Sequence, residues 1–307
     1  MRLVITGKNG QLGSALRMLL DQEGLAEHYG VTHVDYLGRE DLDLTDKKQV
    51  LDHPIFSQMD SDTVLLNAAA FTAVDHAETD PAAALAGNED IPANLAAVCA
   101  TTGAFLIHVS TDYVFPAGSP GHRTSPWQAH DQIGPSSLYG ESKARGERAV
   151  RASGARAAIA RTAWVYSGDT LPEHKDFVST MAAKARAGQP AIVVDDQVGS
   201  PTYAIDLAHG LLMLAHQPQP GTVHIVGSGQ ASWYELARAV YDALGANPDE
   251  LIKPVPSHAY SQLAIRPQYS VLGTDTWRAA GHPDLPHWTH GLKRALAGDS
   301  QVHLEGK

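Results

Sequence analysis

A short apolar run that leads directly into a glycine-rich turn constrains the fold of this chain most. Residues 2–6 have the pattern of a buried strand, which ends at Gly7. A G-x-x-G-x-x-G pattern continues through Gly10 and Gly13, and residues 11–22 carry apolar side chains at helical spacing. A strand, a glycine turn and a helix in this order present free backbone N–H groups to a phosphate. The context predicts a dinucleotide-binding unit, although the glycines alone would also fit an ordinary strand-to-helix turn.

The alternation of strand and helix patterns continues along the chain. Strands are expected over residues 31–37, 63–67, 104–109 and 157–161. Helices are expected over residues 81–101, kinked or split by Pro92, and over residues 137–151. This alternation predicts an α/β fold of the Rossmann type, with a doubly wound parallel sheet covered by helices on both faces.

The last part of the chain has a different pattern. A loop is expected over residues 167–174 and a short strand over residues 192–194, and prolines gather between positions 247 and 290. Helices are expected over residues 177–187, 203–215 and 233–244. We expect a smaller C-terminal substrate lobe that is interleaved with the last sheet elements. The predicted boundaries are residues 1–165 plus about 200–228 for the Rossmann domain, and about 166–199 plus 229–307 for the lobe.

Composition argues against several classes of protein. The 307 residues carry a formal net charge of −11, which disfavours a nucleic-acid-binding protein. The single cysteine, Cys99, excludes a disulfide framework and is expected to be a packed core thiol. No segment approaches the roughly 18 apolar residues of a membrane span, and the start of the chain lacks the pattern of a signal peptide. No membrane association and a cytoplasmic location are therefore expected.

A tyrosine and a lysine stand four residues apart in one of the expected helices. Tyr139 and Lys143 therefore share one helix face. A phenol with its free pKa of ~10 is a poor acid–base catalyst at neutral pH. A neighbouring ammonium stabilises the phenolate, lowers that pKa and can also hold ribose hydroxyls. The pair indicates an acid–base site, although a solvated helix surface would show the same spacing.

Polar residues follow the expected strand at residues 104–109. Thr111, Asp112 and Tyr113 stand at its carboxyl end, where open parallel sheets bind ligands. Thr111 can donate a hydrogen bond to a carbonyl oxygen, and Asp112 and Tyr113 can contact substrate hydroxyls. A strand that simply ends in small polar residues is the alternative. We favour a constellation of Thr111 with Tyr139 and Lys143.

Together these motifs resemble the extended short-chain dehydrogenase/reductase superfamily. Five further stretches make the resemblance more specific. They are residues 67–75 (NAAAFTAVD), 161–166 (RTAWVY), 194–202 (VDDQVGSPT), 266–267 (RP) and 285–292 (LPHWTHGL). This series is similar to the dTDP-4-dehydrorhamnose reductase family and covers most of the chain.

The resemblance implies an oxidoreductase that uses NAD(P)H to reduce the C4 ketone of dTDP-4-dehydro-L-rhamnose, which gives dTDP-L-rhamnose. The implied catalytic residues are Thr111, Tyr139 and Lys143. The implied cofactor-binding residues are Gly7, Gly10, Gln11, Leu12, Gly13, Asp43, Leu44, Ala68, Ala69, Ala70 and Asn88, with Tyr139 and Lys143. The implied substrate-binding residues are Val74, Thr111, Asp112, Tyr113, Trp164 and Arg266.

The residues after the second strand decide between NAD and NADP in this fold. Asp35 falls within the expected strand, too early to reach the ribose. Arg39 lies just past the strand, and Lys8 of the glycine turn can approach from the other side. Because a guanidinium can hold a phosphate through two parallel hydrogen bonds, we expect NADPH to be preferred and NADH to be accepted. A solvated loop arginine is the alternative interpretation.

Two departures from the family pattern limit what the resemblance implies. The family usually has Asn-Phe after the Trp-Val-Tyr stretch, whereas here Asp176 and Phe177 follow a longer segment, residues 167–175. Some bacterial members carry a glutamate early in the first helix as part of a metal-linked dimer contact, and residues 13–16 here are GSAL. No metal is therefore expected, and a homodimer stays compatible with the resemblance.

Three other functions fit parts of the pattern. One is a reductase of another dTDP-4-keto-deoxysugar. Another is a non-catalytic regulatory subunit, because the beta subunit of methionine adenosyltransferase resembles the same family. The third is a redox-sensing dinucleotide binder. The intact set of Thr111, Tyr139 and Lys143 favours an enzyme, since a structural subunit does not require it.

Overall fold

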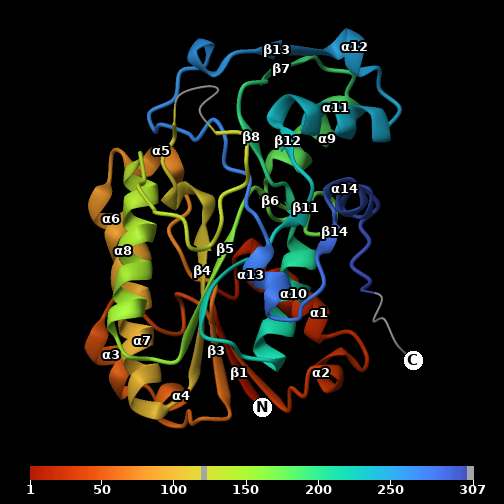
Figure 1. Ribbon diagram of the computed structural model, residues 1–307. Coiled ribbons are helices and arrows are strands. Elements are labelled where there is room, and N and C mark those ends of the chain that lie inside the picture. Colours follow the sequence, from red (N-terminus) through yellow and green to blue (C-terminus); the bar gives the residue numbers. More distant parts are fainter. Residues whose placement is uncertain (119–122, 303–307) are drawn as a thin grey trace.

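A central parallel sheet organises the molecule. The computed structural model describes residues 1–118 and 123–302, and in this part of the chain the main sheet has six strands in the order β10-β5-β4-β3-β1-β2 (Figure 1). The strands are β1 (Arg2–Thr6), β2 (His33–Leu37), β3 (Thr63–Asn67), β4 (Phe105–Thr111), β5 (Ala157–Thr162) and β10 (Gly221–His224). Every neighbouring pair is parallel. The predicted α/β fold is confirmed, and β10 is the strand that the sequence patterns missed.

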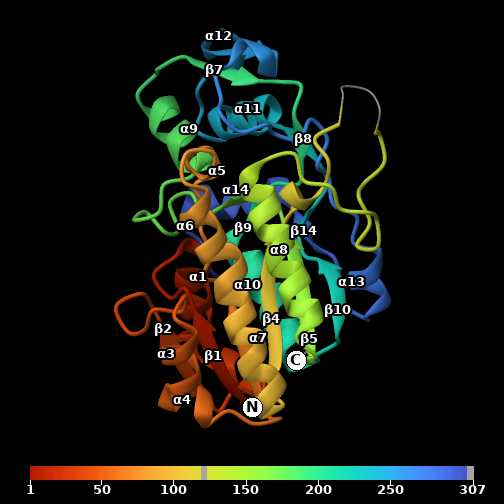
Figure 2. The same cartoon turned by 90° about the vertical axis from the view of Figure 1, so that its left-hand side faces the viewer.

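Helices cover both faces of this sheet, as Figures 1 and 2 show. On one face α1 (Gln11–Leu20) packs against α10 (Ala204–His216). On the other face α7 (Ile91–Thr102) packs against α8 (Leu138–Ala152), with α3 (Lys47–Asp52) beside α7. The shorter helices are α2 (Leu25–His28), α4 (Pro54–Ser57), α5 (Val74–Ala77) and α6 (Pro81–Leu85). Separate apolar clusters fill the two interfaces, and Cys99 is buried in the cluster beneath α7.

A second group of elements lies beyond the carboxyl ends of the strands (Figure 1, top). There β7 (Ala191–Val194) pairs in parallel with β13 (Ile252–Val255), and both lie against α11 (Trp233–Ala243), which also packs on α9 (Phe177–Arg186). The connecting pairs are β6 (Val165–Tyr166) with β9 (Thr202–Tyr203), and β8 (Val198–Gly199) with β12 (Ala231–Ser232). The remaining elements are β11 (Gly227–Ser228), α12 (Pro248–Leu251), α13 (Asp275–Ala279), β14 (Leu285–His287) and α14 (Trp288–Ala297). Of these, α13 and β14 return to the sheet and contact β10 and α10.

The long helix expected over residues 81–101 is interrupted by a wider turn. A π-helical segment, Ala86–Asp90, separates α6 from α7. Pro92 has no N–H to donate to the carbonyl four residues earlier, that of Asn88, so the α-helical ladder opens at this point. The freed carbonyl lies against Gly146 of α8, where a Cβ would come within 2.0 Å of it. The predicted break at Pro92 is confirmed, and it allows α8 to pack close to this segment.

A buried ion pair fixes α8 to the sheet. Glu147 is fully buried, and its carboxylate accepts hydrogen bonds from Arg161 Nε (2.8 Å) and Nη2 (2.7 Å) in β5. It also accepts from Ser110 Oγ in β4 (2.7 Å) and from Arg151 Nη2 (2.9 Å). Burial opposes ionisation, but Arg161, Ser110 and Arg151 outweigh it and lower the pKa of Glu147 to about 2. Stability from this carboxylate is complete above its unfolded pKa and is lost as pH falls toward about 2.

Across residues 1–118 and 123–302, no helix combines the length and the apolar character that a bilayer crossing requires.

Replacement of Arg161 by Met should destabilise the protein strongly. The substitution keeps an apolar stem of similar length but leaves the buried Glu147 carboxylate without its bidentate partner. Breaking a buried pair in this way costs about 3 kcal/mol or more. Arg278→Met, which breaks the exposed pair with Asp284, should cost less than about 1 kcal/mol. Urea unfolding at pH 7 compares the two variants, and equal losses would contradict this account of the ion pair.

Candidate active site

The glycine turn follows β1, the strand at which the order of strands along the sheet changes direction. β1 pairs with β2 on one side and with β3 on the other, which makes the carboxyl ends of β1 and β3 a switch point where such sheets bind ligands. Gly7 has φ +79°, and a Cβ there would lie 2.7 Å from backbone atoms of Ala68 and Ala69. A Cβ on Gly13 would lie 2.2 Å from the Gly7 carbonyl oxygen. The turn and the Ala68–Ala70 stretch are therefore in direct contact, as the cofactor assignment requires.

The first turn of α1 is open for an anion. Gly10 caps the helix without a side-chain hydrogen bond, and the first turn contains no acidic residue. The first backbone N–H groups of a helix have no intrahelical partner and carry the positive end of its dipole. Leu12 is half-buried against the core below this turn. The donor set therefore suits a pyrophosphate, which is the group that a nicotinamide dinucleotide presents there.

Tyr139 and Thr111 come together where β4 ends and α8 begins. Ser137 caps α8 by accepting a hydrogen bond from Gly140 N (3.1 Å). A Cβ on Gly140 would lie 2.3 Å from the Tyr113 carbonyl oxygen, so this glycine lets the helix approach the strand end. Burial raises the pKa of Tyr139 to about 12, and a hydrogen bond with Thr111 partly offsets this effect. The phenol is therefore a protonated group held beside the Thr111 hydroxyl.

Lys143 lies one helical turn further along α8 and is 3% exposed. Its ammonium donates a 2.7 Å hydrogen bond to the Val109 carbonyl of β4. Burial lowers the pKa of Lys143 to about 8, although the charge of Glu147 opposes that shift. The three residues that the sequence singled out thus converge at the carboxyl end of β4.

The neighbours of this triad have different exposures. Tyr113 is half-buried and packs edge-to-face on Tyr139, with ring centroids 5.3 Å apart. Val74 of α5 is half-buried and packs against the apolar cluster that contains Tyr139. Asp112 is buried, accepts a 3.0 Å hydrogen bond from Thr111 Oγ1, and has its pKa raised by burial to about 6. Asp112 therefore supports Thr111 through Oδ1, while its buried Oδ2 has no hydrogen-bond partner among the described residues.

Asn88 is fully buried and holds the scaffold of the site. Its side chain accepts from Phe71 N (2.9 Å) and donates to Phe71 O (3.0 Å) and Ser142 Oγ (2.9 Å). These bonds tie the segment after Ala70 to α8. Asn88 therefore fixes the wall along which the cofactor was expected to run, with its own amide already fully engaged.

Asp43 and Leu44 are presented differently from each other. Asp43 is exposed and its carboxylate accepts from Thr45 N (2.9 Å) and Oγ1 (2.7 Å). The Leu44 side chain is buried in the core, and its carbonyl accepts from Asn94 Nδ2 (3.0 Å). An adenine ring at this edge would therefore meet the Asp43 side chain and the backbone between the two residues.

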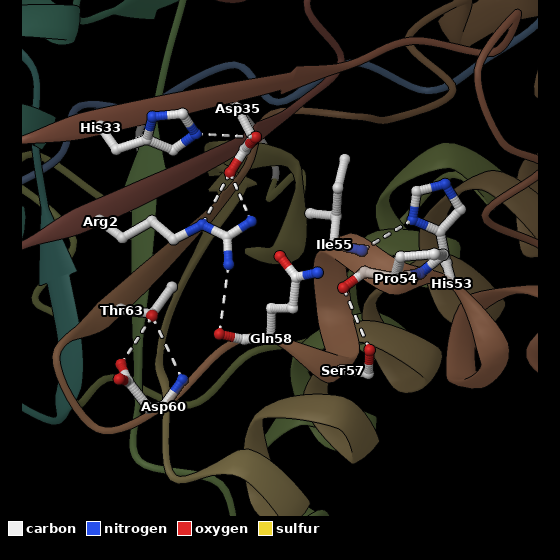
Figure 3. A network of polar contacts seen from close by, with 10 residues as sticks. All are labelled: Arg2, His33, Asp35, His53, Pro54, Ile55, Ser57, Gln58, Asp60 and Thr63. Carbon is white, nitrogen blue, oxygen red and sulfur yellow. Dashed lines mark hydrogen bonds and ion pairs between the residues drawn. The ribbon is translucent and has the colours of Figure 1, made fainter.

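The end of β2 carries charges of both signs. Asp35 lies inside the strand, as predicted, and Figure 3 shows its carboxylate held by Arg2, with a 2.7 Å bond from Arg2 Nε. Lys8 of the glycine turn forms ion pairs with Glu40 (3.1 Å) and Asp41 (2.5 Å). Arg39 is exposed, and its guanidinium has no hydrogen-bond or ion-pair partner among the described residues.

Trp164 lies between β5 and β6, in an aromatic group with the first residues of α9 and α11. It has φ +47°, and its ring stacks on Trp233 with centroids 3.6 Å apart and an interplanar angle of 5°. Phe177 packs on Trp233, with ring centroids 4.7 Å apart. Gly199 leaves room for the indole, since a Cβ there would lie 2.4 Å from the Trp164 ring. We call Trp164, Trp233 and Phe177 the aromatic trio.

Arg266 is held by a carboxylate in this structure. Its guanidinium donates to Asp75 through Nη1 (3.1 Å) and Nη2 (2.8 Å), and to Gln262 Oε1 (2.7 Å). Asp75 also accepts from Ala264 N (3.0 Å). This link fastens the segment around Arg266 to α5, which carries Val74. Arg266 therefore lies near the predicted substrate residues but has its charge balanced by Asp75.

Sequence reasoning missed several residues that shape the site. Asp75 stands inside the quoted 67–75 stretch, so the family motif carried a signal that was not used. Gly140 and Gly146 are small residues in the same helix as Tyr139, which is a packing signal. Trp233 had no local signal, because only the folded chain brings it to Trp164.

The comparisons with known proteins agree with this geometry. The family model described as RmlD substrate binding domain matches residues 1–300. A dTDP-4-dehydrorhamnose reductase from Mycobacterium tuberculosis (strain CDC 1551 / Oshkosh) is 42% identical over 299 residues, covering 96% of this chain and 92% of that protein.

Solved structures of proteins with the same description are also similar. One from Clostridium acetobutylicum has a TM-score of 0.85 at 32% identity and covers 97% of this chain and 99% of its own. One from Bacillus anthracis, solved in complex with NADP, has a TM-score of 0.84 at 31% identity, covering 96% and 98%.

The glycine turn, the converging Thr111, Tyr139 and Lys143, and similarity along nearly the whole length lead to one assignment: the chain belongs to the dTDP-4-dehydrorhamnose reductase family.

Proposed function

We propose that this protein reduces the C4 ketone of dTDP-4-dehydro-L-rhamnose to an alcohol, which gives dTDP-L-rhamnose. The observation that carries the proposal is the convergence of Thr111, Tyr139 and Lys143 at the carboxyl end of β4, two strands away from β1 and its glycine turn. Relatives described as dTDP-4-dehydrorhamnose reductases support the substrate. The reduction adds a hydride to the carbonyl carbon and a proton to its oxygen, and this chain's own residues supply the proton.

The residues present fit a nicotinamide dinucleotide. The proposed cofactor contacts are the turn from Gly7 to Gly13, the Ala68–Ala70 stretch, the Asp43–Leu44 backbone, and Tyr139 with Lys143. The nicotinamide supplies the hydride when it is bound. The Lys143 ammonium, which the structure holds on the Val109 carbonyl, is also placed to bind ribose hydroxyls.

Tyr139 is the proposed proton donor. In this structure burial raises its pKa to about 12, so the phenol carries the proton that the developing alkoxide needs. When the Thr111 hydroxyl turns from Asp112 to the same oxygen, it donates a hydrogen bond there and stabilises the growing charge. The positive charge of Lys143 stabilises the phenolate left after the transfer. Tyr139 and Thr111 thus act at the C4 oxygen of the sugar, and Lys143 acts at the phenol oxygen of Tyr139.

The substrate is proposed to lie between this triad and the aromatic trio. Val74 and Tyr113 border Tyr139, and Trp164 of the aromatic trio is the proposed contact from the other side of the substrate. Arg266 can meet the diphosphate once its bond to Asp75 opens. The division into a Rossmann domain and an interleaved substrate lobe is the arrangement that this reading requires.

A second reaction has support from particular relatives. A protein from Streptomyces niveus described as dTDP-4-keto-6-deoxy-D-glucose reductase is 36% identical to this chain, and it covers 96% of both chains. NADPH oxidation measured against a panel of dTDP-4-keto sugars separates the two reactions. Turnover of dTDP-4-dehydro-L-rhamnose above the other sugars supports the proposal. Absence of turnover with every sugar would instead support a non-catalytic binding protein.

Tyr139→Phe should lower kcat by about 10²–10⁴-fold, because the substitution keeps the ring and removes the proton donor. The affinity for NADPH, measured by calorimetry, should fall far less than kcat, since the ring remains packed against Tyr113 and the other proposed cofactor contacts are kept. Unchanged turnover would remove Tyr139 from the mechanism.

Cofactor preference provides a separate test. We propose that NADPH is preferred over NADH. Arg39, which has no ion-pair partner among the described residues, is the cation proposed to meet the 2′-phosphate, because Lys8 is already paired with Glu40 and Asp41. Hydrogen bonds to charged groups contribute roughly 1.5–3 kcal/mol, so Arg39→Ala should lower the NADPH/NADH ratio of kcat/KM by about ten-fold or more. Arg278→Ala, on α13 beside β10 at the opposite edge of the sheet, is the matched control. A wild-type protein that uses NADH equally well would refute the role given to Arg39.

A further inference from the structure

The Gln11 side chain extends from α1 to the segment between β6 and α9. Gln11 is the first residue of α1, directly after the turn expected to hold the pyrophosphate. Its Nε2 donates to Ser167 Oγ (2.9 Å) and to Asp176 Oδ2 (3.0 Å). Only its backbone N–H therefore remains available to a phosphate. The contact joins two segments that are more than 150 positions apart in the sequence.

Asp176 is the centre of this contact. Its Oδ2 also accepts from Ser167 N (2.7 Å), Ser167 Oγ (3.0 Å) and Gly168 N (3.2 Å). Its Oδ1 caps α9 by accepting from Ser179 N (2.8 Å). One carboxylate thus fixes the start of α9, the segment after β6 and the first residue of α1 relative to one another.

A second bond supports the same junction. Ser14 Oγ, one turn further along α1, lies 3.0 Å from His174 Nε2. Ser14 is buried, and His174 belongs to the same segment that ends at Asp176. Two side chains of α1, those of Gln11 and Ser14, therefore hold residues 167–176.

The aromatic trio continues this connection on the substrate side. Asp176 is followed by Phe177, which packs on Trp233, and Trp233 stacks on Trp164. Trp164 returns through β6 to Ser167, which is fully buried and bonded to Gln11. The contacts form a closed ring from the glycine turn to the trio and back.

We propose that Gln11, Ser167 and Asp176 act as a coupling clamp, through which cofactor binding at α1 positions the aromatic trio for the sugar nucleotide. The proposal rests on the proposed function and adds positioning residues to it. A pyrophosphate bound at the first turn of α1 fixes the backbone of Gln11. The clamp passes that constraint to Ser167 and Asp176, and hence to both ends of the ring that carries Trp164.

Coupling of this kind is a measurable free energy. If the clamp transmits this free energy, bound NADP⁺ raises the protein's affinity for the sugar nucleotide. The bound sugar nucleotide then raises the affinity for NADP⁺ by the same factor. Thymidine diphosphate is a suitable probe, because it carries the nucleotide and both phosphates of the proposed substrate. Calorimetry measures its Kd with and without saturating NADP⁺, and the ratio of the two values is the coupling factor.

We expect a coupling factor of about five-fold or more in the wild-type protein, within the usual range for coupled sites. Gln11→Met removes the amide and keeps the side-chain length, so the factor should fall to within about two-fold of unity. Ser167→Ala should give an intermediate value, because Gln11 keeps its bond to Asp176. Gln22→Met is the matched control: it removes the same group just beyond the same helix, where Gln22 donates to the Ser300 carbonyl, and should retain the wild-type factor.

The outcomes separate this inference from the proposed function. The coupling factor is a ratio, so a general loss of stability or of binary affinity does not reduce it, and thermal unfolding of each variant checks the folded state. A wild-type protein that binds both ligands without coupling, or Gln11→Met with undiminished coupling, would overturn the clamp and leave the proposed function standing. A wild-type protein that binds neither NADP⁺ nor thymidine diphosphate would overturn both.

Discussion

The buried carboxylate of Glu147 holds together the part of the molecule on which the site depends. It joins α8 to β4 through Ser110 and to β5 through Arg161. Tyr139 and Lys143 lie on the same helix, so this ion pair also sets their distance from Thr111 at the end of β4. Removing an ion pair from water costs desolvation energy. Four hydrogen bonds to the Glu147 carboxylate offset that cost. The close approach is completed by Gly140 and Gly146, where a Cβ would collide with backbone oxygens of the neighbouring segments.

Electrostatics in the site differ from those of the molecule as a whole. The formal net charge of −11 repels a dinucleotide and a sugar diphosphate at long range. Locally the first turn of α1 has no acidic residue, and Lys143 lies buried beside β4. Arg266 and Lys8 are balanced by carboxylates, so their charge becomes available to a ligand only when these pairs open. The charges that an anion meets are therefore few and held in place.

Side-chain contacts link the elements around the main sheet to the later part of the chain. Asp176 and Gln11 link α1 to α9, and Asp75 and Arg266 link α5 to the segment between β13 and α13. Both links join an element that follows a sheet strand to a segment from the later part of the chain. A reductase needs its cofactor and its sugar held in one orientation, and such positioning contributes several kcal/mol to catalysis. The polar links are consistent with that requirement.

The sequence by itself determined the α/β architecture, the glycine turn and the placing of Tyr139 and Lys143 on one helix. These features depend on residues close together in the chain: apolar runs of four to seven residues, glycines at fixed spacing, and Tyr139 four positions before Lys143. The family motifs extended that knowledge to Trp164 and Arg266. The tertiary structure alone decided the direction of the Gln11 side chain, the burial of Asp112, the stacking of Trp233 on Trp164 and the pairing of Arg266 with Asp75. The physical reason is distance along the chain, because the Asp75–Arg266 partners are 191 positions apart and no local pattern encodes such a contact.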